Sequence, residues 1–133
     1  MKLTSRLSEI VPSATLALTA KARALQQQGV DVDWVDFDGN GYIDPDAVIA
    51  KLQPRTRAVV INHGSNVIGT VQPVAPIGAA CRARGIPLVL DVSQTAGMLP
   101  LDIEDLGAGV IGFTGHKSLQ GPMGIGGMYV HES

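Results

Sequence analysis

The sequence predicts an α/β fold with a mostly parallel sheet and flanking helices. Short runs rich in β-branched residues recur along the chain, and stretches with helical start and stop signals separate them. Strands that alternate with helices are typical of right-handed crossovers between parallel strands. The length of 133 residues is enough for one domain with a core of its own.

The composition excludes several classes of function. Hydrophobic residues make up 45% and charged residues 17%, which excludes a disordered tail. The net charge of −2 and the 4% of aromatic residues offer neither a basic surface nor a stacking platform for nucleic acid. No apolar run reaches the ~20 residues that span a bilayer, and residues 1–9 show no signal-peptide pattern. The single cysteine, Cys81, forms no intrachain disulfide, so we expect a cytoplasmic protein without membrane or nucleic-acid partners.

The first third of the chain is expected to hold two helices and one strand. A helix is predicted over Ser13–Gln28, because Ser13 is a suitable N-cap and Gly29 a suitable stop. Residues 30–37 alternate apolar and acidic side chains and predict a strand with one solvent-exposed face. A short helix is expected to begin at Asp44–Pro45 and to end before Pro54.

Four short apolar runs downstream predict the remaining strands, the first of them fully buried. These runs are Ala58–Asn62, Pro87–Asp91, Val110–Thr114 and Gly126–Val130. A helix is expected between the first two runs, from Pro73 to Arg84, because Gly85 follows as a stop signal.

Polar side chains follow three of these strands at the point where each strand ends. They are His63, Ser65 and Asn66, then Asp91, Ser93 and Gln94, then Thr114, His116 and Lys117. In an open parallel sheet, ligands bind beyond the carboxyl ends of the strands. In a chain so poor in charge, this gathering of polar groups predicts a functional site.

The pairing of Lys117 with Asp91 points to a pyridoxal 5′-phosphate (PLP) site. A desolvated lysine has a lowered pKa and is a better nucleophile, so it can form an imine. A carboxylate can keep the pyridine nitrogen protonated, and the loop glycines allow the backbone to approach a ligand. The alternative is that Asp91 only caps a turn and Lys117 is solvated. The pattern alone leaves the two readings equally open.

Three segments resemble class V aminotransferases, the family of cysteine desulfurases and selenocysteine lyases. They are NHGSNVIGTVQPV (62–74), LVLDVSQTAGMLPLDI (88–103) and FTGHKSLQGPMGIGGMYV (113–130). The resemblance implies that residues 33–133 are part of the large domain of a PLP-dependent enzyme of fold type I, acting on cysteine or a related amino acid as a dimer. Residues 1–32 instead resemble the start of class I aspartate aminotransferases, so residues 1–133 are expected to form one partial, chimeric domain.

The resemblance also implies individual roles. Lys117 would be the Schiff-base lysine, and Asp91 would pair with the pyridine nitrogen. Gln94 would hydrogen-bond to the phenolic oxygen of the ring, and Asn66 would contact the side where cofactor and substrate meet. His63 is expected to lie behind these residues rather than in contact with the ligand.

Four further residues receive expectations from the same resemblance. Thr114 and His116 would bind the phosphate group. Ser93 is expected to serve the turn, and Cys81 matches a structural helix position rather than the sulfur-carrying cysteine.

Whether the chain turns over a substrate is left open by the sequence. The matching text lacks the family's ring-stacking segment, its substrate-binding arginine and its catalytic cysteine loop. One hypothesis is therefore a PLP-dependent enzyme, and the other is a non-enzymatic remnant that keeps the fold with weak or no cofactor binding.

A third hypothesis is a calcium-loop module. Six residues match calcium-loop positions 1, 3, 5, 6, 7 and 9, namely Asp36, Asp38, Asn40, Gly41, Tyr42 and Asp44. Position 12, which needs a bidentate glutamate, is Ala47, and the residues before the loop predict a strand rather than a helix. We therefore expect a turn and no metal site.

Overall fold

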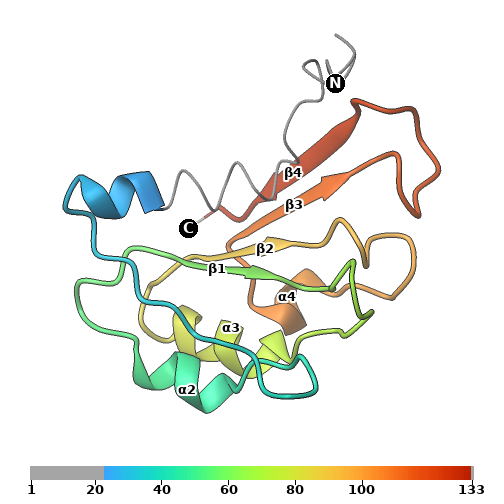
Figure 1. The fold of residues 1–133 in the computed structure, drawn as a ribbon. Helices are drawn as coiled ribbons and strands as arrows, with labels where there is room; N and C mark the ends of the chain where they lie inside the picture. Colours follow the sequence, from blue (N-terminus) through green and yellow to red (C-terminus); the bar gives the residue numbers. More distant parts are fainter. Residues whose placement is uncertain (1–22, 133) are drawn as a thin grey trace, which may run out of the picture. The chain divides into compact units, whose positions relative to one another are not determined.

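The computed structural model describes residues 23–132 (Figure 1). The chain divides into two compact units, and the boundary lies between residues 34 and 35. In the first unit, residues 23–27 are helical and Gly29 follows with φ +86°. The end of the predicted helix is therefore confirmed, because a left-handed glycine commonly terminates a helix. The predicted start at Ser13 lies outside the described residues.

The strand expected over residues 30–37 is wrong. Only Phe37 pairs there, through an isolated antiparallel bridge to Ile43. Between them the Oδ1 atom of Asp38 accepts hydrogen bonds from the backbone N–H groups of Asn40, at 2.9 Å, and Tyr42, at 2.8 Å. Alternating side chains form a strand only where a neighbour supplies ladder hydrogen bonds, and residues 30–36 have no such neighbour within residues 23–132.

The calcium-like spacing in this region is explained by the turn itself. The backbone N–H of Tyr42, together with that of Asn40, lowers the pKa of Asp38. The carboxylate is thus already engaged by its own backbone, as is usual for an Asp-initiated turn. No cluster of three metal-ligating side chains occurs within residues 23–132.

A four-stranded sheet in the order β1-β2-β3-β4 forms the centre of the second unit (Figure 1). Strands β1 (Val59–Asn62), β2 (Leu88–Asp91) and β3 (Val110–Thr114) are parallel, and β4 (Gly126–Val130) runs antiparallel to β3. The mostly parallel sheet is therefore confirmed. The connection between β3 and β4 is too short for a crossover, so the chain turns back on itself there.

Three helices lie on the same side of this sheet (Figure 1). They are α2 (Pro45–Ala50), α3 (Val74–Arg82) and α4 (Ile103–Leu106). Asp44 caps α2 as predicted, by accepting a hydrogen bond from the backbone N–H of Asp46. The short α4 was not predicted, although Asp102 caps it and Gly107 ends it with φ +63°. No helix within residues 23–132 has the length and apolar character to cross a membrane.

Two adjoining clusters of apolar side chains form the core between the sheet and the helices. Ile77 and Cys81 from α3 pack with Leu88 of β2 in one cluster, and all three are fully buried. Cys81 therefore has the structural position expected of it, and burial raises the pKa of its thiol. The second cluster includes Leu90 of β2 and Ile111 of β3.

Strand β1 is not fully buried, contrary to expectation. Val59 and Ile61 pack against the core, but Val60 between them is 72% exposed. Alternate side chains of a strand point to opposite faces of the sheet, so Val60 points away from the face on which Val59 and Ile61 meet the core. A run of β-branched residues shows that a segment is a strand, but it does not show how many of its faces are covered.

Candidate cofactor-binding site

The loops after β1, β2 and β3 meet at one edge of the sheet, because parallel strands end on the same side. Their contact is close at two glycines. A Cβ atom on Gly64 would lie 2.9 Å from Cγ2 of Thr95 and 3.1 Å from Cβ of Gln94, and one on Gly97 would lie 3.0 Å from Cδ2 of Leu119. The structure thus brings together the three loops in which the sequence predicts the polar residues.

Asp91 lies half-buried at the end of β2. Its Oδ1 atom accepts a hydrogen bond of 2.8 Å from the backbone N–H of Ser93. The carboxylate therefore caps the turn with one oxygen, as the alternative reading of the sequence expects. The described residues supply no ion pair to Asp91, so its second oxygen is available to a cationic ligand group.

Lys117 is half-buried in a loop that is closed by backbone hydrogen bonds. Its carbonyl oxygen accepts a hydrogen bond of 2.8 Å from the N–H of Gln120. The N–H of Gly121 donates to the carbonyl of Gly115, and the N–H of Gly115 donates to that of Ile125, both at 2.7 Å. Such a loop holds the lysine backbone in place, although the neighbouring His116 is exposed.

Thr114, the last residue of β3, has a hydroxyl group that no described residue engages. Its Oγ1 atom is buried and has no hydrogen-bond partner among the described residues. An unsatisfied buried polar group costs about 1–3 kcal/mol, so native structures seldom keep one without a reason. A phosphate oxygen would accept a hydrogen bond from this hydroxyl, and the donor set at this edge therefore fits a phosphorylated cofactor.

The two predicted amide residues occupy different environments. Gln94 is half-buried in the turn after β2, where Gly64 packs against it. Asn66 is exposed in the turn after β1, which Ser65 organises through contacts from its hydroxyl oxygen to the N–H groups of Val67 and Ile68. Gln94 is thus placed within the gathered loops, and Asn66 at their surface.

His63 and Thr95 form a buried pair at the same edge. The Nδ1 atom of His63 lies 2.9 Å from Oγ1 of Thr95, and the residues are only 6% and 3% exposed. Burial lowers the pKa of His63. The sequence predicts His63 behind the site but does not single out Thr95. No local signal marks Thr95, because its partner lies 32 residues away.

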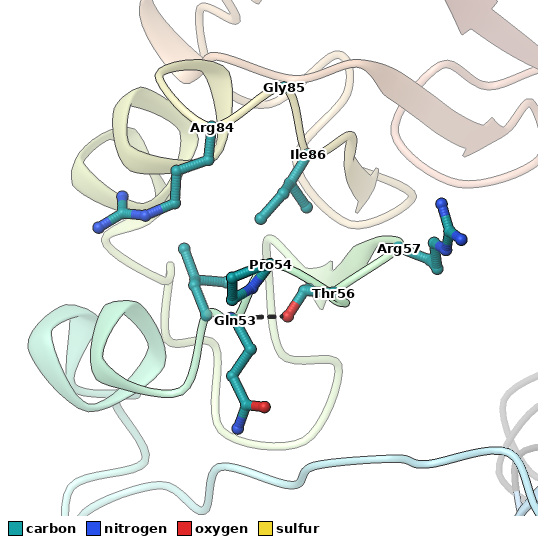
Figure 2. Close-up of a pocket in the computed structure, with 8 residues that line it drawn as sticks. Gln53, Pro54, Thr56, Arg57, Arg84, Gly85 and Ile86 are labelled. Atoms are coloured by element: carbon teal, nitrogen blue, oxygen red, sulfur yellow. Dashed lines mark hydrogen bonds between the residues drawn. The ribbon is translucent and has the colours of Figure 1, made fainter.

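A hollow of about 360 Å³ lies elsewhere, beside the segments that lead into β1 and β2 (Figure 2). Arg57 and Arg84 are among its lining residues, but their guanidinium groups lie on opposite sides of it. Arg84 donates a hydrogen bond of 2.9 Å to the carbonyl of Ala80 in its own helix. The hollow therefore belongs to the amino edge of the sheet and is separate from the gathered polar loops.

An open α/β sheet whose carboxyl-edge loops meet belongs to a class of domain that binds ligands at that edge. The family model for class-V aminotransferases matches residues 12–133, so the chain belongs to that family. The resemblance seen in three segments is confirmed. The match also includes most of residues 1–32, the part that resembles class I aspartate aminotransferases.

Curated relatives are cysteine desulfurases. The chain is 42% identical over 114 residues to cysteine desulfurase IscS of Enterobacter sp. (strain 638), and the alignment covers 86% of this chain and 28% of the relative. The chain thus spans little more than a quarter of the length of the curated relatives it matches. Class-V aminotransferases and cysteine desulfurases depend on PLP.

Solved structures of the same kind share the fold. A structure titled SspA in complex with cysteine matches with a TM-score of 0.79 and 31% identity, over 84% of this chain and 32% of that one. The apo cysteine desulfurase of Thermococcus onnurineus NA1 matches with a TM-score of 0.77 and 28% identity, over 87% and 29%. The predicted partial fold of a PLP-dependent enzyme is therefore confirmed.

Proposed function

We propose that this chain binds PLP at the carboxyl edge of its sheet, as part of one large domain of a cysteine desulfurase-like protein. The observation that carries the proposal is the buried hydroxyl of Thr114, which has no hydrogen-bond partner among the described residues and lies at the sheet edge that also carries Asp91 and Lys117. Family membership supports the same cofactor. Cysteine or a related amino acid is the substrate class that the relatives suggest.

Two residues have the chemistry to hold the reactive ring. The Lys117 amine is the covalent attachment point, and the closed loop around it limits where that amine can reach. Asp91 pairs with the ring nitrogen through the oxygen that the Ser93 N–H leaves unused. When PLP is bound, it supplies an electron sink for bonds at the α-carbon of an amino acid.

The remaining polar residues would orient the cofactor. Thr114 and His116 bind the phosphate, Gln94 donates to the phenolic oxygen, and Asn66 contacts the exposed side where a substrate enters. Burial supports the different roles of the two amides, because Gln94 is half-buried whereas Asn66 is exposed. A metal ion has no part in this proposal.

An absorbance titration with PLP tests the proposal. The wild-type chain is expected to give a visible band that saturates, and Lys117→Ala to give none, since the attachment point is gone. Lys51→Ala is the matched control, because Lys51 lies just after α2 and far along the chain from the site loops. Equal saturation in Lys117→Ala would reject the proposal.

A second candidate is a chain that binds the cofactor without turning over a substrate. None of the arginines of residues 23–132 belongs to the three loops at the carboxyl edge. Residues 23–132 therefore offer an amino acid no guanidinium anchor at this edge, and orientation contributes several kcal/mol to catalysis. We expect sulfide release from cysteine no faster than with free PLP. Faster release that Lys117→Ala abolishes would favour the enzyme instead.

Assembly as a cytoplasmic homodimer completes the proposal. Each of the three site loops carries exposed apolar side chains, namely Val67 and Ile68, then Met98, then Met123 and Ile125. Apolar side chains that gather at a surface favour contact with a partner. A second copy of the chain is the partner that we propose, and the one buried cysteine suits a reducing compartment.

A further inference from the structure

A buried link joins the end of β1 to the turn that carries Asp91 and Gln94. The backbone N–H of His63 donates a hydrogen bond of 2.9 Å to the carbonyl of Asp91, which extends the β1-β2 ladder by one residue. The His63 side chain then reaches Thr95, at the far end of the same turn. His63 thus contacts both ends of the segment 91–95.

The neighbouring carbonyl group indicates which of His63 and Thr95 donates the hydrogen bond between them. The carbonyl oxygen of Val92 already accepts hydrogen bonds from the N–H groups of Thr95, at 2.9 Å, and Ala96, at 2.8 Å. These bonds use both of its lone pairs. The Thr95 hydroxyl lies 3.4 Å from the same oxygen, which is long for an O–H donor. The hydroxyl therefore donates to Nδ1 of His63.

This arrangement requires a neutral imidazole. Nδ1 accepts a hydrogen bond only when it carries no hydrogen of its own, so the ring hydrogen of His63 is on Nε2. Burial lowers the pKa of His63 and thereby favours the neutral form near pH 7. The link is thus a hydrogen bond from the Thr95 hydroxyl to the neutral imidazole. Both groups are largely buried, so leaving either one unpaired would be costly.

We propose that His63 and Thr95 are positioning residues that hold the turn of residues 91–95, and so orient Asp91 and Gln94 toward the cofactor. The proposal rests on the proposed function for its consequence, but not for its structural part. Inside the turn, the Ser93 N–H already fixes one oxygen of Asp91. Gly64 leaves room for Thr95 and Gln94 to pack against β1, because a Cβ there would meet both.

Hydrogen exchange at the Ser93 amide tests the structural part without any cofactor. Thr95→Val removes the hydroxyl and keeps the shape, so exchange is expected to become about fivefold faster, as for the loss of one net hydrogen bond. Thr95→Ser keeps the hydroxyl and is expected to exchange at the wild-type rate. Unchanged exchange in Thr95→Val would overturn the proposal.

A pair of histidine variants separates positioning from direct contact. His63→Asn keeps a polar δ atom that can meet the Thr95 hydroxyl, whereas His63→Gln offers a polar atom only at the ε position. Positioning through Thr95 predicts that Asn preserves the slow Ser93 exchange and Gln does not. Preservation by Gln and loss with Asn would show that His63 acts through Nε2 and would overturn the proposal. Thermal unfolding of each variant confirms that it is folded.

The dissociation constant for PLP then tests the consequence. Thr95→Val and His63→Gln are expected to bind PLP about fivefold more weakly, with Thr95→Ser and His63→Asn near the wild type. Wild-type affinity in all four variants would overturn the role toward the cofactor. If the wild-type chain itself fails to bind PLP, the proposed function fails, and the exchange rates alone decide whether His63 and Thr95 hold the turn.

Discussion

At the end of β3, the Thr114 hydroxyl is buried and has no hydrogen-bond partner among the described residues. For the fold alone this is a cost, since such a group lowers stability by about 1–3 kcal/mol. The same hydroxyl is an advantage once an anionic oxygen reaches it. Stability and ligand binding therefore place opposite demands on this residue, which allows them to be measured apart.

Replacement of Thr114 by valine separates these demands. Thr114→Val keeps the side-chain shape and removes the unsatisfied hydroxyl, so the free energy of unfolding without cofactor is expected to stay the same or rise by about 1 kcal/mol. The affinity for PLP is expected to fall in the same variant. Urea unfolding and absorbance titration measure the two effects, with Thr114→Ser as the control that keeps the hydroxyl. Weaker folding together with unchanged affinity would contradict the assignment.

The pH dependence of stability reports on His63. Burial lowers the pKa of its imidazole in the folded chain below the ordinary value of 6.5, so the unfolded chain binds the proton more readily. The resulting contribution to stability is complete above pH 6.5 and is lost as the pH falls through the lower, folded pKa. Urea unfolding at pH 7.5 and pH 5.5 is expected to show less of this loss in His63→Gln than in the wild type. Equal losses would count against a buried, neutral histidine.

At the scale of elements, the sequence predicts best where the signal is local. Strands β3 and β4 begin and end at the predicted residues, and α2 begins at its predicted Asp44 cap. The strand expected over residues 30–37 fails because pairing depends on a neighbour, which the alternation of side chains does not reveal. Helix α4 escapes notice because its four residues are too few for a periodic pattern.

The contact between α3 and α4 depends on two facing glycines. A Cβ atom on Gly78 would meet the carbonyl oxygen of Leu106, and one on Gly107 would lie 2.6 Å from the carbonyl carbon of Gly78. Gly78→Ala is expected to lower the free energy of unfolding by about 2 kcal/mol, because backbone must move to make room. This loss occurs although alanine favours a helix by about 1 kcal/mol over glycine.

The control for this prediction adds atoms where space is open. Ala79→Leu enlarges an exposed side chain on the same helix and is expected to change stability by no more than about 0.5 kcal/mol. Urea unfolding of both variants decides the matter. A Gly78→Ala chain as stable as the wild type would show that the two helices do not approach as closely as the structure places them.

At the scale of the whole molecule, the order of strands explains why the site residues could be named from the sequence. Parallel strands deliver their following loops to one edge, so Asp91, Thr114 and Lys117 could be expected together. The side-chain contacts between these loops could not be predicted, because they join residues far apart in the sequence. The Thr95 hydroxyl, paired with a residue of another loop, is the clearest example.

Exposed apolar side chains on the site loops predict that the whole molecule forms a dimer. Val67 and Met123 are 84% and 85% exposed on two of the site loops, and burying them would favour association. Light scattering is expected to give a dimer that Met123→Asp weakens, since a charge would then lie in the contact. Ala79→Asp, an exposed position on α3, serves as the control that leaves the dimer intact. A monomer at every concentration would contradict this expectation.

Trapping the cofactor on the chain tests directly whether PLP attaches to Lys117. Borohydride reduction of the full chain with PLP, followed by peptide mapping, locates the modified lysine. We expect one major adduct on Lys117, which falls to background in Lys117→Ala, with only trace labelling of Lys2, Lys21, Lys51 or any other amine. An adduct spread over those other lysines, with Lys117 unmodified, would contradict the placement of a cofactor at the carboxyl edge of this sheet.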